Sequence, residues 1–227
     1  MIDCAVWWAE PLPNEPRFIG LLDELELGRH AGYRQEIDQR RFLTGRVLAK
    51  TIAGERLGRA PADIVFDASC DDCDKPHGVP KVPGLALSIS HSGDRIGLAV
   101  TSGAPVGLDV ESASRRAEDS LIEYALNETE RLGLKGLEAD ERASAFFVYW
   151  TRKEAVMKAT GRGLRIPLHS ITLAPFDAPA ALLASSTPAL DPATTRMADL
   201  DPGSGYRAAV AVLTTEDLAV TEHSWHP

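Results

Sequence analysis

The order of apolar patterns along the chain constrains its fold more than any single motif does. Residues 3–9 alternate as a strand, two helical segments follow, and short strand candidates close the first half; the second half repeats that order. The predicted strands are residues 3–9, 64–67, 85–90, 95–101, 106–111, 171–174, 206–213 and 219–224, and the predicted helices are residues 16–27, 34–57, 120–126 and 140–160. This order predicts an α+β fold. Individual residues do not repeat, so one large domain and two halves meeting near residues 102–105 both remain open.

Residues 174–205 interrupt this order. The stretch is rich in Ala, Pro, Asp and Thr, a composition that is typical of irregular surface segments. We therefore expect a surface excursion there rather than part of a site.

The charge balance restricts the possible partners. The 227 residues contain 24 basic and 33 acidic side chains, which gives a formal net charge of −9. General nucleic-acid and membrane-surface binders need clustered positive charge, so we expect neither class of partner.

No segment approaches the run of about 20 apolar residues that crosses a bilayer, and the first residues lack a basic, apolar leader. Three cysteines are too few and odd in number for a disulfide framework, so we expect a cytoplasmic protein.

Residues 106–111, Val-Gly-Leu-Asp-Val-Glu, place two carboxylates on one face of a predicted strand. The three apolar side chains take the opposite face because side chains alternate along a strand. Asp109 and Glu111 are then about 6–7 Å apart at their Cα atoms, close enough for both to reach one hard cation. An exposed strand with two hydrated acids fits the same residues.

The predicted helix 140–160 carries a carboxylate on its apolar stripe. At i, i+3 and i+4 spacing, that stripe consists of Ala143, Phe147, Trp150, Glu154 and Met157. Unpaired burial of Glu154 would be very costly, so this side chain must be neutralised, paired or metal-bound. Lys158 follows one turn later and offers the simplest alternative, an intrahelical ion pair. If Glu154 instead meets the carboxylates of residues 106–111, three acids and a lysine form a magnesium and phosphate site.

Residues 87–93 run from a strand into a turn that is rich in hydroxyl groups. Ser90 and His91 are neighbours on a strand and point to opposite faces, so they cannot act together as nucleophile and base. Small hydroxyls, backbone amides and one imidazole suit contacts to phosphate. A capped hairpin with a structural histidine is the alternative.

Basic residues of the predicted helix 34–57 form a second candidate phosphate contact. Arg46 and Lys50 lie one turn apart, and an arginine can bind a phosphate through two hydrogen bonds. A hydrated helix face is the commoner meaning of such charges.

Cysteines close to a histidine raise the question of a zinc site. Cys70, Cys73 and His77 supply only part of a tetrahedral ligand set, and Cys4 is distant in the sequence. We expect the cysteine pair to be a packing feature of a loop.

Taken together, these segments resemble the two-lobed 4'-phosphopantetheinyl transferases that activate peptide and polyketide synthetases. The matching stretches are residues 106–111, Trp150 to Lys158 with the following Gly161-Arg162-Gly163-Leu164, Ser90-His91-Ser92, Lys75-Pro76-His77-Gly78, and Arg41 to Lys50. The resemblance implies an α+β fold of two α/β lobes related by a pseudo-twofold axis. These would be residues 1–104 and 105–227, with the active site in the groove between them.

The resemblance also implies an activity. The protein would transfer the 4'-phosphopantetheine arm of coenzyme A to a serine of an apo acyl or peptidyl carrier protein and release adenosine 3',5'-bisphosphate. The carriers would serve fatty-acid, polyketide or nonribosomal peptide synthesis, and the transferase would be a monomer. The first lobe would contact the 3'-phosphate and adenosine of coenzyme A, and the second would bind metal and carry the catalytic groups.

Individual residues gain roles from the same resemblance. Asp109, Glu111 and Glu154 would hold Mg²⁺ or Mn²⁺ at the pyrophosphate, with Glu111 either a direct ligand or a group behind the ligands. Glu154 would also take the proton of the carrier serine, and Lys158 would counter negative charge on the transferring phosphate. The expected coenzyme A contacts are Ser90, His91, Asp109 and Lys158 at the phosphates, Lys75 and Pro76 beside the adenosine, and Arg46 or Arg41 at the 3'-phosphate.

Two other functions would use the same residues. A Mg²⁺-dependent phosphohydrolase or nucleotidyl transferase explains the acids, but not the order of Lys75-Pro76, Ser90-His91 and the segment 150–158. A non-catalytic module that binds coenzyme A or a carrier protein has no need of a carboxylate beside a lysine on a buried stripe. The transferase is therefore the preferred hypothesis.

Overall fold

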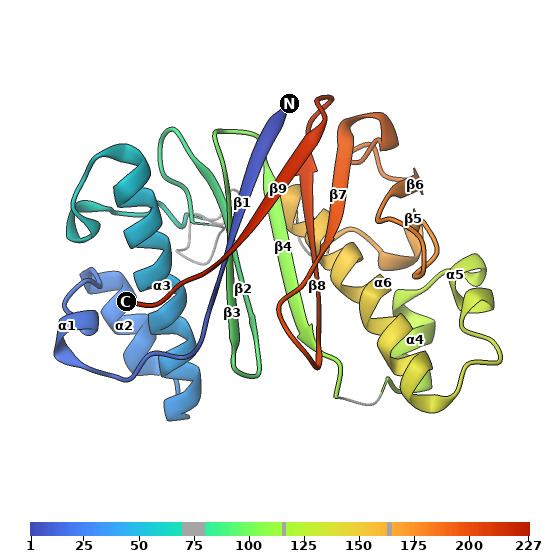
Figure 1. Ribbon diagram of the computed structural model, residues 1–227, viewed down its shortest axis with the longest axis horizontal. Helices are drawn as coiled ribbons and strands as arrows, with labels where there is room; N and C mark the ends of the chain where they lie inside the picture. Colours follow the sequence, from blue (N-terminus) through green and yellow to red (C-terminus); the bar gives the residue numbers. More distant parts are fainter. Residues whose placement is uncertain (70–79, 115–116, 163–164) are drawn as a thin grey trace.

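Helices on both outer faces enclose two β-sheets. The computed structural model describes residues 1–69, 80–114, 117–162 and 165–227. Figure 1 shows α1, α2 and α3 on one side, the sheets in the centre, and α4, α5 and α6 on the other side. The helices are α1 (Pro16–Ile19), α2 (Glu24–Gly32), α3 (Glu36–Leu57), α4 (Asp119–Ala125), α5 (Glu128–Gly133) and α6 (Ala139–Ala159).

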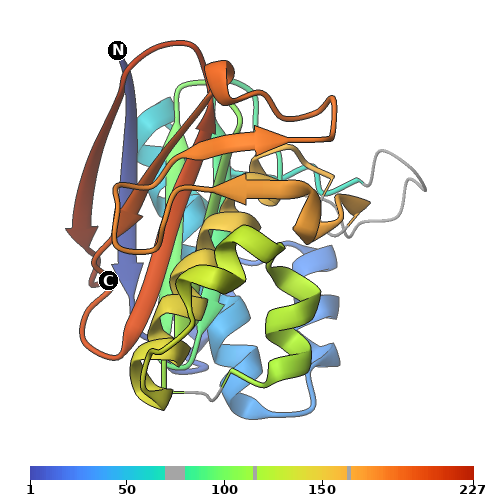
Figure 2. The ribbon, with the colours of Figure 1, turned by 90° about the vertical axis from the view of Figure 1, so that its right-hand side faces the viewer.

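The strands form two main sheets and one short pair. In the described residues, one sheet has the order β2-β3-β1-β9, the second has the order β4-β8-β7, and β5 pairs with β6. The strands are β1 (Ile2–Ala9), β2 (Ala86–Ser92), β3 (Arg95–Thr101), β4 (Val106–Ser112), β5 (Ile171–Leu173), β6 (Leu182–Ser185), β7 (Thr195–Leu200), β8 (Tyr206–Leu213) and β9 (Leu218–Ser224). Figure 2 views the molecule from the side of α4, α5 and α6, with β5 and β6 above these helices.

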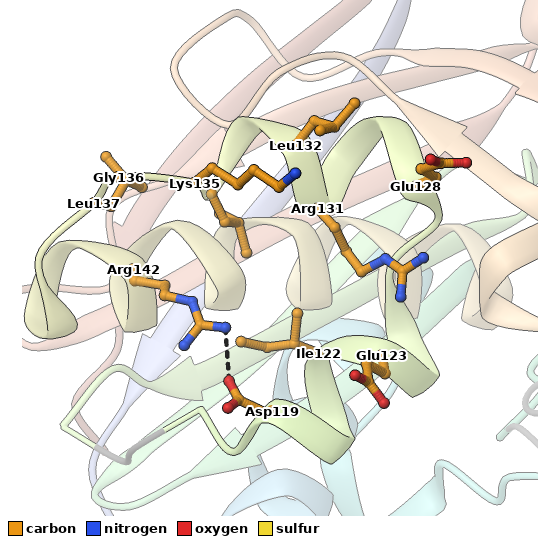
Figure 3. A pocket seen from close by; sticks show the side chains of 11 residues that line it. Asp119, Ile122, Glu123, Glu128, Arg131, Leu132, Lys135, Gly136, Leu137 and Arg142 are labelled. Carbon is orange, nitrogen blue, oxygen red and sulfur yellow. Dashed lines mark hydrogen bonds and ion pairs between the residues drawn. The ribbon is translucent and has the colours of Figure 1, made fainter.

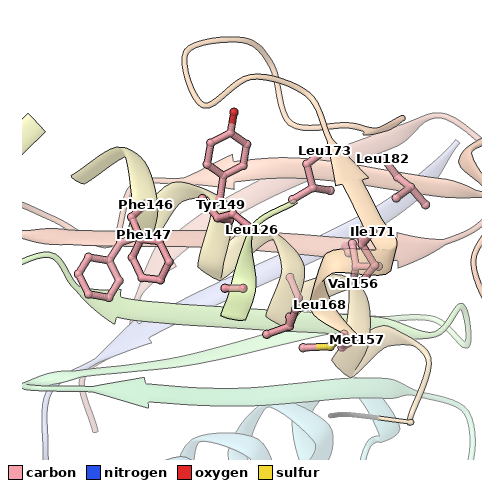
Figure 4. Packing of buried hydrophobic residues seen from close by; sticks show 14 of the residues in the cluster. Leu126, Phe146, Phe147, Tyr149, Val156, Met157, Leu168, Ile171, Leu173 and Leu182 are labelled. Carbon is pink, nitrogen blue, oxygen red and sulfur yellow. The ribbon is translucent and has the colours of Figure 1, made fainter. Parts of the chain in front are cut away.

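Strand alternation separates three apolar layers among the described residues, and a fourth, smaller cluster lies between α1 and α3. Within β8, Ala208, Val210 and Val212 pack against the first sheet, whereas Ala209 and Ala211 belong to the layer beneath α6. A third layer joins α3 to β2 and β3. Figure 4 shows the layer around α6, which contains Leu126, Phe146, Phe147, Tyr149, Val156, Met157, Leu168, Ile171, Leu173 and Leu182. Each long helix is therefore fixed against one sheet.

A glycine allows α6 to lie directly against β4. A Cβ atom at Gly107 would be 2.0 Å from the carbonyl oxygen of Ala155, so a larger residue cannot occupy this position without moving the helix. Gly107 is on the same face of β4 as the two carboxylates, because side chains alternate. The close approach thus brings Glu154 and Lys158 of α6 alongside those carboxylates.

The predicted α+β class is confirmed, and one predicted helix is divided for a local reason. The helix expected at residues 16–27 is wrong as a single element, because α1 ends at Ile19 and α2 begins at Glu24. Asp23 and Glu26 form a capping box in which each side chain accepts a hydrogen bond from the other residue's backbone N–H. This box starts a new helix inside the predicted one.

Residues 64–67, predicted as a strand, do not form one in the described part of the chain. Asp67 makes an isolated bridge to Lys81, and the preceding Ile64 and Phe66 are buried in the layer beneath α3. Their apolar alternation reflects this packing rather than strand pairing.

The surface excursion expected at residues 174–205 is wrong, because the stretch contains β6 and β7. β7 pairs with β8 in the second sheet. Arg152 of α6 is 0% exposed and donates to both carboxylate oxygens of Asp199 in β7, at 2.8 and 2.6 Å. Local composition cannot indicate an ion pair with a partner 47 residues away.

The boundary between residues 104 and 105 and the pseudo-twofold relation stay predictions. β9, from the second half of the sequence, pairs in parallel with β1 in the first sheet, as the red and blue strands of Figure 1 show. No helix within the described ranges is both long and apolar enough to cross a bilayer.

Candidate active site at the junction of the two sheets

Lys158 and Asp109 form the centre of the site. The Lys158 amino group donates to Asp109 Oδ1 at 2.7 Å, to Ser90 Oγ at 3.0 Å and to the Leu108 carbonyl at 3.0 Å. Ser90 Oγ in turn donates to Asp109 Oδ1 at 3.0 Å. Lys158 therefore pairs with a carboxylate of β4 and not, among the described ion pairs, with Glu154 one turn away.

Three carboxylates share this part of the structure at an electrostatic cost. Burial raises the pKa of Asp109, although Lys158 and Ser90 act in the opposite direction. Burial, followed by repulsion from Asp109, raises the pKa of Glu154 to about 7, and Glu111 contributes in the same direction. A positive charge placed between Asp109 and Glu154 would lower both pKa values.

The donor set fits a hard divalent cation at Asp109 and Glu154. Asp109 is 5% exposed, and its Oδ2 atom is buried without a hydrogen-bond partner in the described residues. Such an oxygen is a natural ligand for Mg²⁺ or Mn²⁺. As they stand, no three His, Cys, Asp or Glu side chains in the described ranges are grouped closely enough to hold a metal. The three-ligand set that includes Glu111 stays a prediction.

A cleft of about 310 Å³, here called the Arg46 cleft, opens beside this centre. Its described walls are Arg29, Tyr33, Arg41, Phe42, Gly45, Arg46, Pro80, Ser88, Ile89, His91 and Lys158. The structure thus brings Arg41, Arg46, His91 and Lys158, which the sequence predicts as phosphate contacts, to one cavity. Arg41 also donates to the Gly93 carbonyl of the β2–β3 turn at 2.8 Å and to Asp38 of its own helix at 2.8 Å, so two of its donors are already engaged.

The surroundings of His91 favour the neutral form of its imidazole. Loss of water around the imidazole lowers its pKa, and the positive charges of Arg41 and Lys158 lower it further. An anion bound in the Arg46 cleft would reverse part of that shift. The cleft is therefore suited to a ligand with several negative charges.

Arg46 and Lys50 are equivalent candidates for a phosphate contact in the sequence, but their surroundings differ in the structure. Lys50 is 1% exposed; it donates to the Ile64 carbonyl at 2.6 Å and lies 3.0 Å from Glu26 Oε2. Arg46 lines the cleft, and its Nε is 3.7 Å from Glu26 Oε1. Burial lowers the pKa of Arg46 and Glu26 opposes that shift. Lys50 thus lies inside the protein, whereas Arg46 lines the cleft.

Other predicted residues lie outside the described ranges. These are Lys75 and Pro76, the expected adenosine contacts, and the Cys70/Cys73 pair with His77. Cys4 is buried and burial raises its pKa to about 12, so it is an unreactive thiol.

A larger hollow of about 640 Å³ lies among α4, α5 and α6 (Figure 3). Acidic and basic side chains alternate around it, and Arg142 donates to Asp119 at 2.7 Å. Of the described residues that line it, none is a predicted site residue. Size alone therefore does not identify the active site.

Sequence reasoning missed Ser88 and Ser92, which bind β4 on either side of Ser90. Ser88 Oγ accepts from the Leu108 N–H at 3.0 Å, and Ser92 Oγ donates to Glu111 Oε2 at 2.8 Å. Their sequence pattern could have indicated this role. Serine occupies every second position of residues 88–92, and this spacing places all three hydroxyls on one face of the strand.

Known proteins resemble this chain in sequence. Residues 105–211 match the model of the 4'-phosphopantetheinyl transferase superfamily. A 4'-phosphopantetheinyl transferase of Bacillus subtilis is 33% identical over 141 residues, which cover 62% of this chain and 60% of that protein. The 4'-phosphopantetheinyl transferase HetI of Nostoc sp. is 31% identical over 195 residues, covering 82% of this chain and 76% of that protein.

A solved structure gives a weaker likeness. The holo-[acyl-carrier-protein] synthase of Thermotoga maritima superimposes with a TM-score of 0.38 and 22% identity, covering 50% of this chain and 64% of that chain. Kinship is therefore shown by the sequence relatives, although the chain spans only about 60% of the length of the first of them. With HetI matched over most of both sequences, the chain belongs to the 4'-phosphopantetheinyl transferase superfamily.

Proposed function

We propose that this protein transfers the 4'-phosphopantetheine group of coenzyme A to a serine hydroxyl of an apo carrier protein. The observation that carries the proposal is the contact of Lys158 with Asp109 at 2.7 Å, beside Glu154 and at the mouth of the cation-lined Arg46 cleft. This arrangement offers a phosphate anchor, a charge that neutralises a phosphate and a carboxylate able to accept a proton.

Coenzyme A fits the Arg46 cleft by charge. Its pyrophosphate and 3'-phosphate are the only strongly acidic groups of the molecule, and the cleft presents Arg41, Arg46, His91 and Lys158. The first three come from residues 1–104 and Lys158 comes from residues 105–227. We therefore assign coenzyme A binding mainly to the first half and catalysis to the second half.

In the proposed reaction, every bond made and broken and the transferred proton are accounted for with the residues present. The carrier serine Oγ forms a bond to the phosphorus that carries pantetheine, and the bond from this phosphorus to the oxygen of adenosine 3',5'-bisphosphate breaks. The electron pair of the broken bond stays on the leaving phosphate, where Lys158 counters the added charge. The serine proton passes to the ionised form of Glu154, which a cation bound beside it would favour by lowering the raised pKa of that carboxyl.

Asp109 and Glu154 would hold a divalent cation, and Glu111 is the third candidate ligand. When bound, Mg²⁺ or Mn²⁺ would supply positive charge at the pyrophosphate. The residues themselves already separate two tasks, because Asp109 is fixed by Lys158 and Ser90 through Oδ1 while its Oδ2 remains available.

The partner in this proposal is an acyl or peptidyl carrier protein of fatty-acid, polyketide or nonribosomal peptide synthesis. The acceptor must present a serine at the mouth of the Arg46 cleft near Glu154. A monomer is sufficient for this chemistry, because every group named above comes from one chain.

Intact-mass spectrometry of an apo carrier protein tests the proposal directly. The carrier is incubated with this protein, coenzyme A and Mg²⁺, with EDTA as one control and the Glu154→Gln variant as the other. A metal-dependent gain of one phosphopantetheine mass is expected only with the unaltered protein. Failure across acyl and peptidyl carriers would reject the transferase.

A melting-temperature assay then separates the two alternatives. Stabilisation by coenzyme A without any transfer would favour a binding module. Stabilisation by ATP with Mg²⁺, and not by coenzyme A, would favour a phosphohydrolase or nucleotidyl transferase.

A further inference from the structure

Seryl hydroxyls join the two sheets where β2 and β4 lie side by side. Although the strands belong to different sheets, alternate backbone N–H groups of β4 donate to hydroxyls of β2. Leu108 N–H donates to Ser88 at 3.0 Å, Val110 N–H to Ser90 at 3.3 Å and Ser112 N–H to Ser92 at 3.1 Å. We call Ser88, Ser90 and Ser92 the serine ladder.

The second and third members of the ladder repeat one geometry. Ser90 accepts from Val110 N–H and donates to the carboxylate of the preceding Asp109 at 3.0 Å. Ser92 accepts from Ser112 N–H and donates to the carboxylate of the preceding Glu111 at 2.8 Å. Each hydroxyl thus fixes a strand backbone and the carboxylate next to it with the same oxygen.

Ser88 lacks the second half of that geometry. The residue before Leu108 is Gly107, which has no side chain to receive a hydrogen bond. Ser88 and Ser92 therefore make the same backbone contact, but only Ser92 also binds a carboxylate. This difference separates the effect of joining the sheets from the effect of orienting an acid.

A strand carboxylate with an unrestrained side chain samples several rotamers, and fixing one rotamer lowers the entropic cost of binding a cation. Glu111 is partly exposed, so a hydrogen bond from Ser92 is an effective restraint on it. Its electrostatic influence on Glu154 shows that its charge reaches the Asp109 and Glu154 pair.

We propose that Ser92 is a positioning residue that orients the Glu111 carboxylate toward the cation site at Asp109 and Glu154. The inference rests on the proposed function for the identity of that site. It assigns the first half of the chain a role in metal binding, because Ser92 ends β2 whereas the carboxylates lie in β4 and α6 of the second half.

Mn²⁺ binding, followed by electron paramagnetic resonance with and without coenzyme A, tests the proposal without a catalytic readout. Ser92→Val removes the hydroxyl, whereas Ser92→Thr has nearly the same shape and retains it. We expect Ser92→Val to weaken Mn²⁺ binding by about 10-fold or more, and Ser92→Thr to restore it. Ser88→Ala, which removes only a backbone contact, should change Mn²⁺ affinity by less than about twofold and still lower the melting temperature.

Three results would overturn the proposal. These are equal Mn²⁺ affinities for Ser92→Val and Ser92→Thr, an equal loss for Ser88→Ala, and no Mn²⁺ binding by the unaltered protein in either condition. Coenzyme A affinity measured in EDTA should be the same for Ser92→Val and Ser92→Thr, and a cooperative thermal transition checks that each of the three variants has folded. Carrier modification without a Ser92 effect would reject this inference alone, and the expected Mn²⁺ pattern without carrier modification would reject the transferase alone.

Discussion

The amino group of Lys158 lies 2.7 Å from Asp109 Oδ1, across the junction between α6 and β4. This ion pair is asymmetric, because Asp109 is nearly buried while Lys158 is 29% exposed. The carboxylate depends on the lysine for its charged state, and the lysine can still reach the Arg46 cleft that it lines. One side chain therefore pairs with a buried carboxylate and lines the cleft.

Lys158→Met should destabilise the protein in a pH-dependent way. The variant leaves the Asp109 carboxylate buried without its cation, at a cost of about 2 kcal/mol at pH 8, less than for a fully buried pair. The cost should shrink at pH 5, since the pKa of Asp109 is already raised by burial and rises further without Lys158. Urea denaturation at both pH values measures this. Equal losses at pH 5 and pH 8 would contradict the assigned pair, and Asp109→Asn combined with Lys158→Met should recover much of the stability.

Glu154→Gln should separate stability from activity. The folded-state pKa of about 7 exceeds the ordinary value of 4.5, so the folded protein holds the proton more tightly. The resulting stabilisation is complete below pH 4.5 and disappears as the pH rises through 7. In EDTA at pH 8, Glu154→Gln should therefore melt a few degrees above the unaltered protein, while transfer falls by about 10²-fold or more. A lower melting temperature at pH 8 would contradict the cause assigned to the shift.

The sequence predicts those parts of the site that depend on local periodicity. The period of two in residues 106–111 correctly separates the carboxylates from the apolar face, and β4 pairs with β8 over the whole segment. The helical stripe is only half right, because Phe147 and Met157 are buried whereas Trp150 and Glu154 are partly exposed at the edge of the buried face of α6. The predictions hold as far as an element's own repeat determines which side chains share a face.

Contacts between distant elements account for what the sequence does not predict. Local spacing offers Lys158 the nearby Glu154, whereas its partner Asp109 is 49 residues away. Lys50 has the same local pattern as Arg46, but α2 covers it and supplies Glu26. Tertiary packing determines which basic residue lines the cleft and which is buried, and local periodicity does not encode that packing.

Gly107→Ala should damage both the fold and the site. The added Cβ would meet the Ala155 carbonyl at 2.0 Å, so α6 must move away from β4 and carry Lys158 from Asp109. We expect a loss of about 3 kcal/mol of unfolding free energy, together with weaker coenzyme A binding.

Gly28→Ala is the matched control, because no atom lies within 4 Å of its added Cβ. In the interior of α2 it should stabilise the protein by about 0.5–1 kcal/mol. Similar behaviour of the two variants in chemical denaturation would refute the close approach.

Glu26→Gln should weaken recognition of one phosphate group through Arg46. Glu26 is 5% exposed, lies between Lys50 and Arg46, and has an Oε1 atom without a hydrogen-bond partner in the described residues. The variant leaves Lys50 buried without its counter-charge, which should cost about 3 kcal/mol of stability. It also removes the charge of the carboxylate that lies 3.7 Å from Arg46 Nε and helps to fix the position of the guanidinium.

If Arg46 contacts the 3'-phosphate, the KM for coenzyme A should rise about 10-fold in Glu26→Gln with kcat little changed. The KM for dephospho-coenzyme A, which lacks that phosphate, should change much less. Glu24→Gln, an exposed acid on the same helix, is the control and should alter stability by no more than about 0.5 kcal/mol. Equal increases in KM for the two substrates would place Arg46 at another part of coenzyme A. A fall in kcat alone would instead show that Arg46 does not contribute to substrate binding. A contact that is equally strong in the ground state and the transition state changes KM and leaves kcat unaltered.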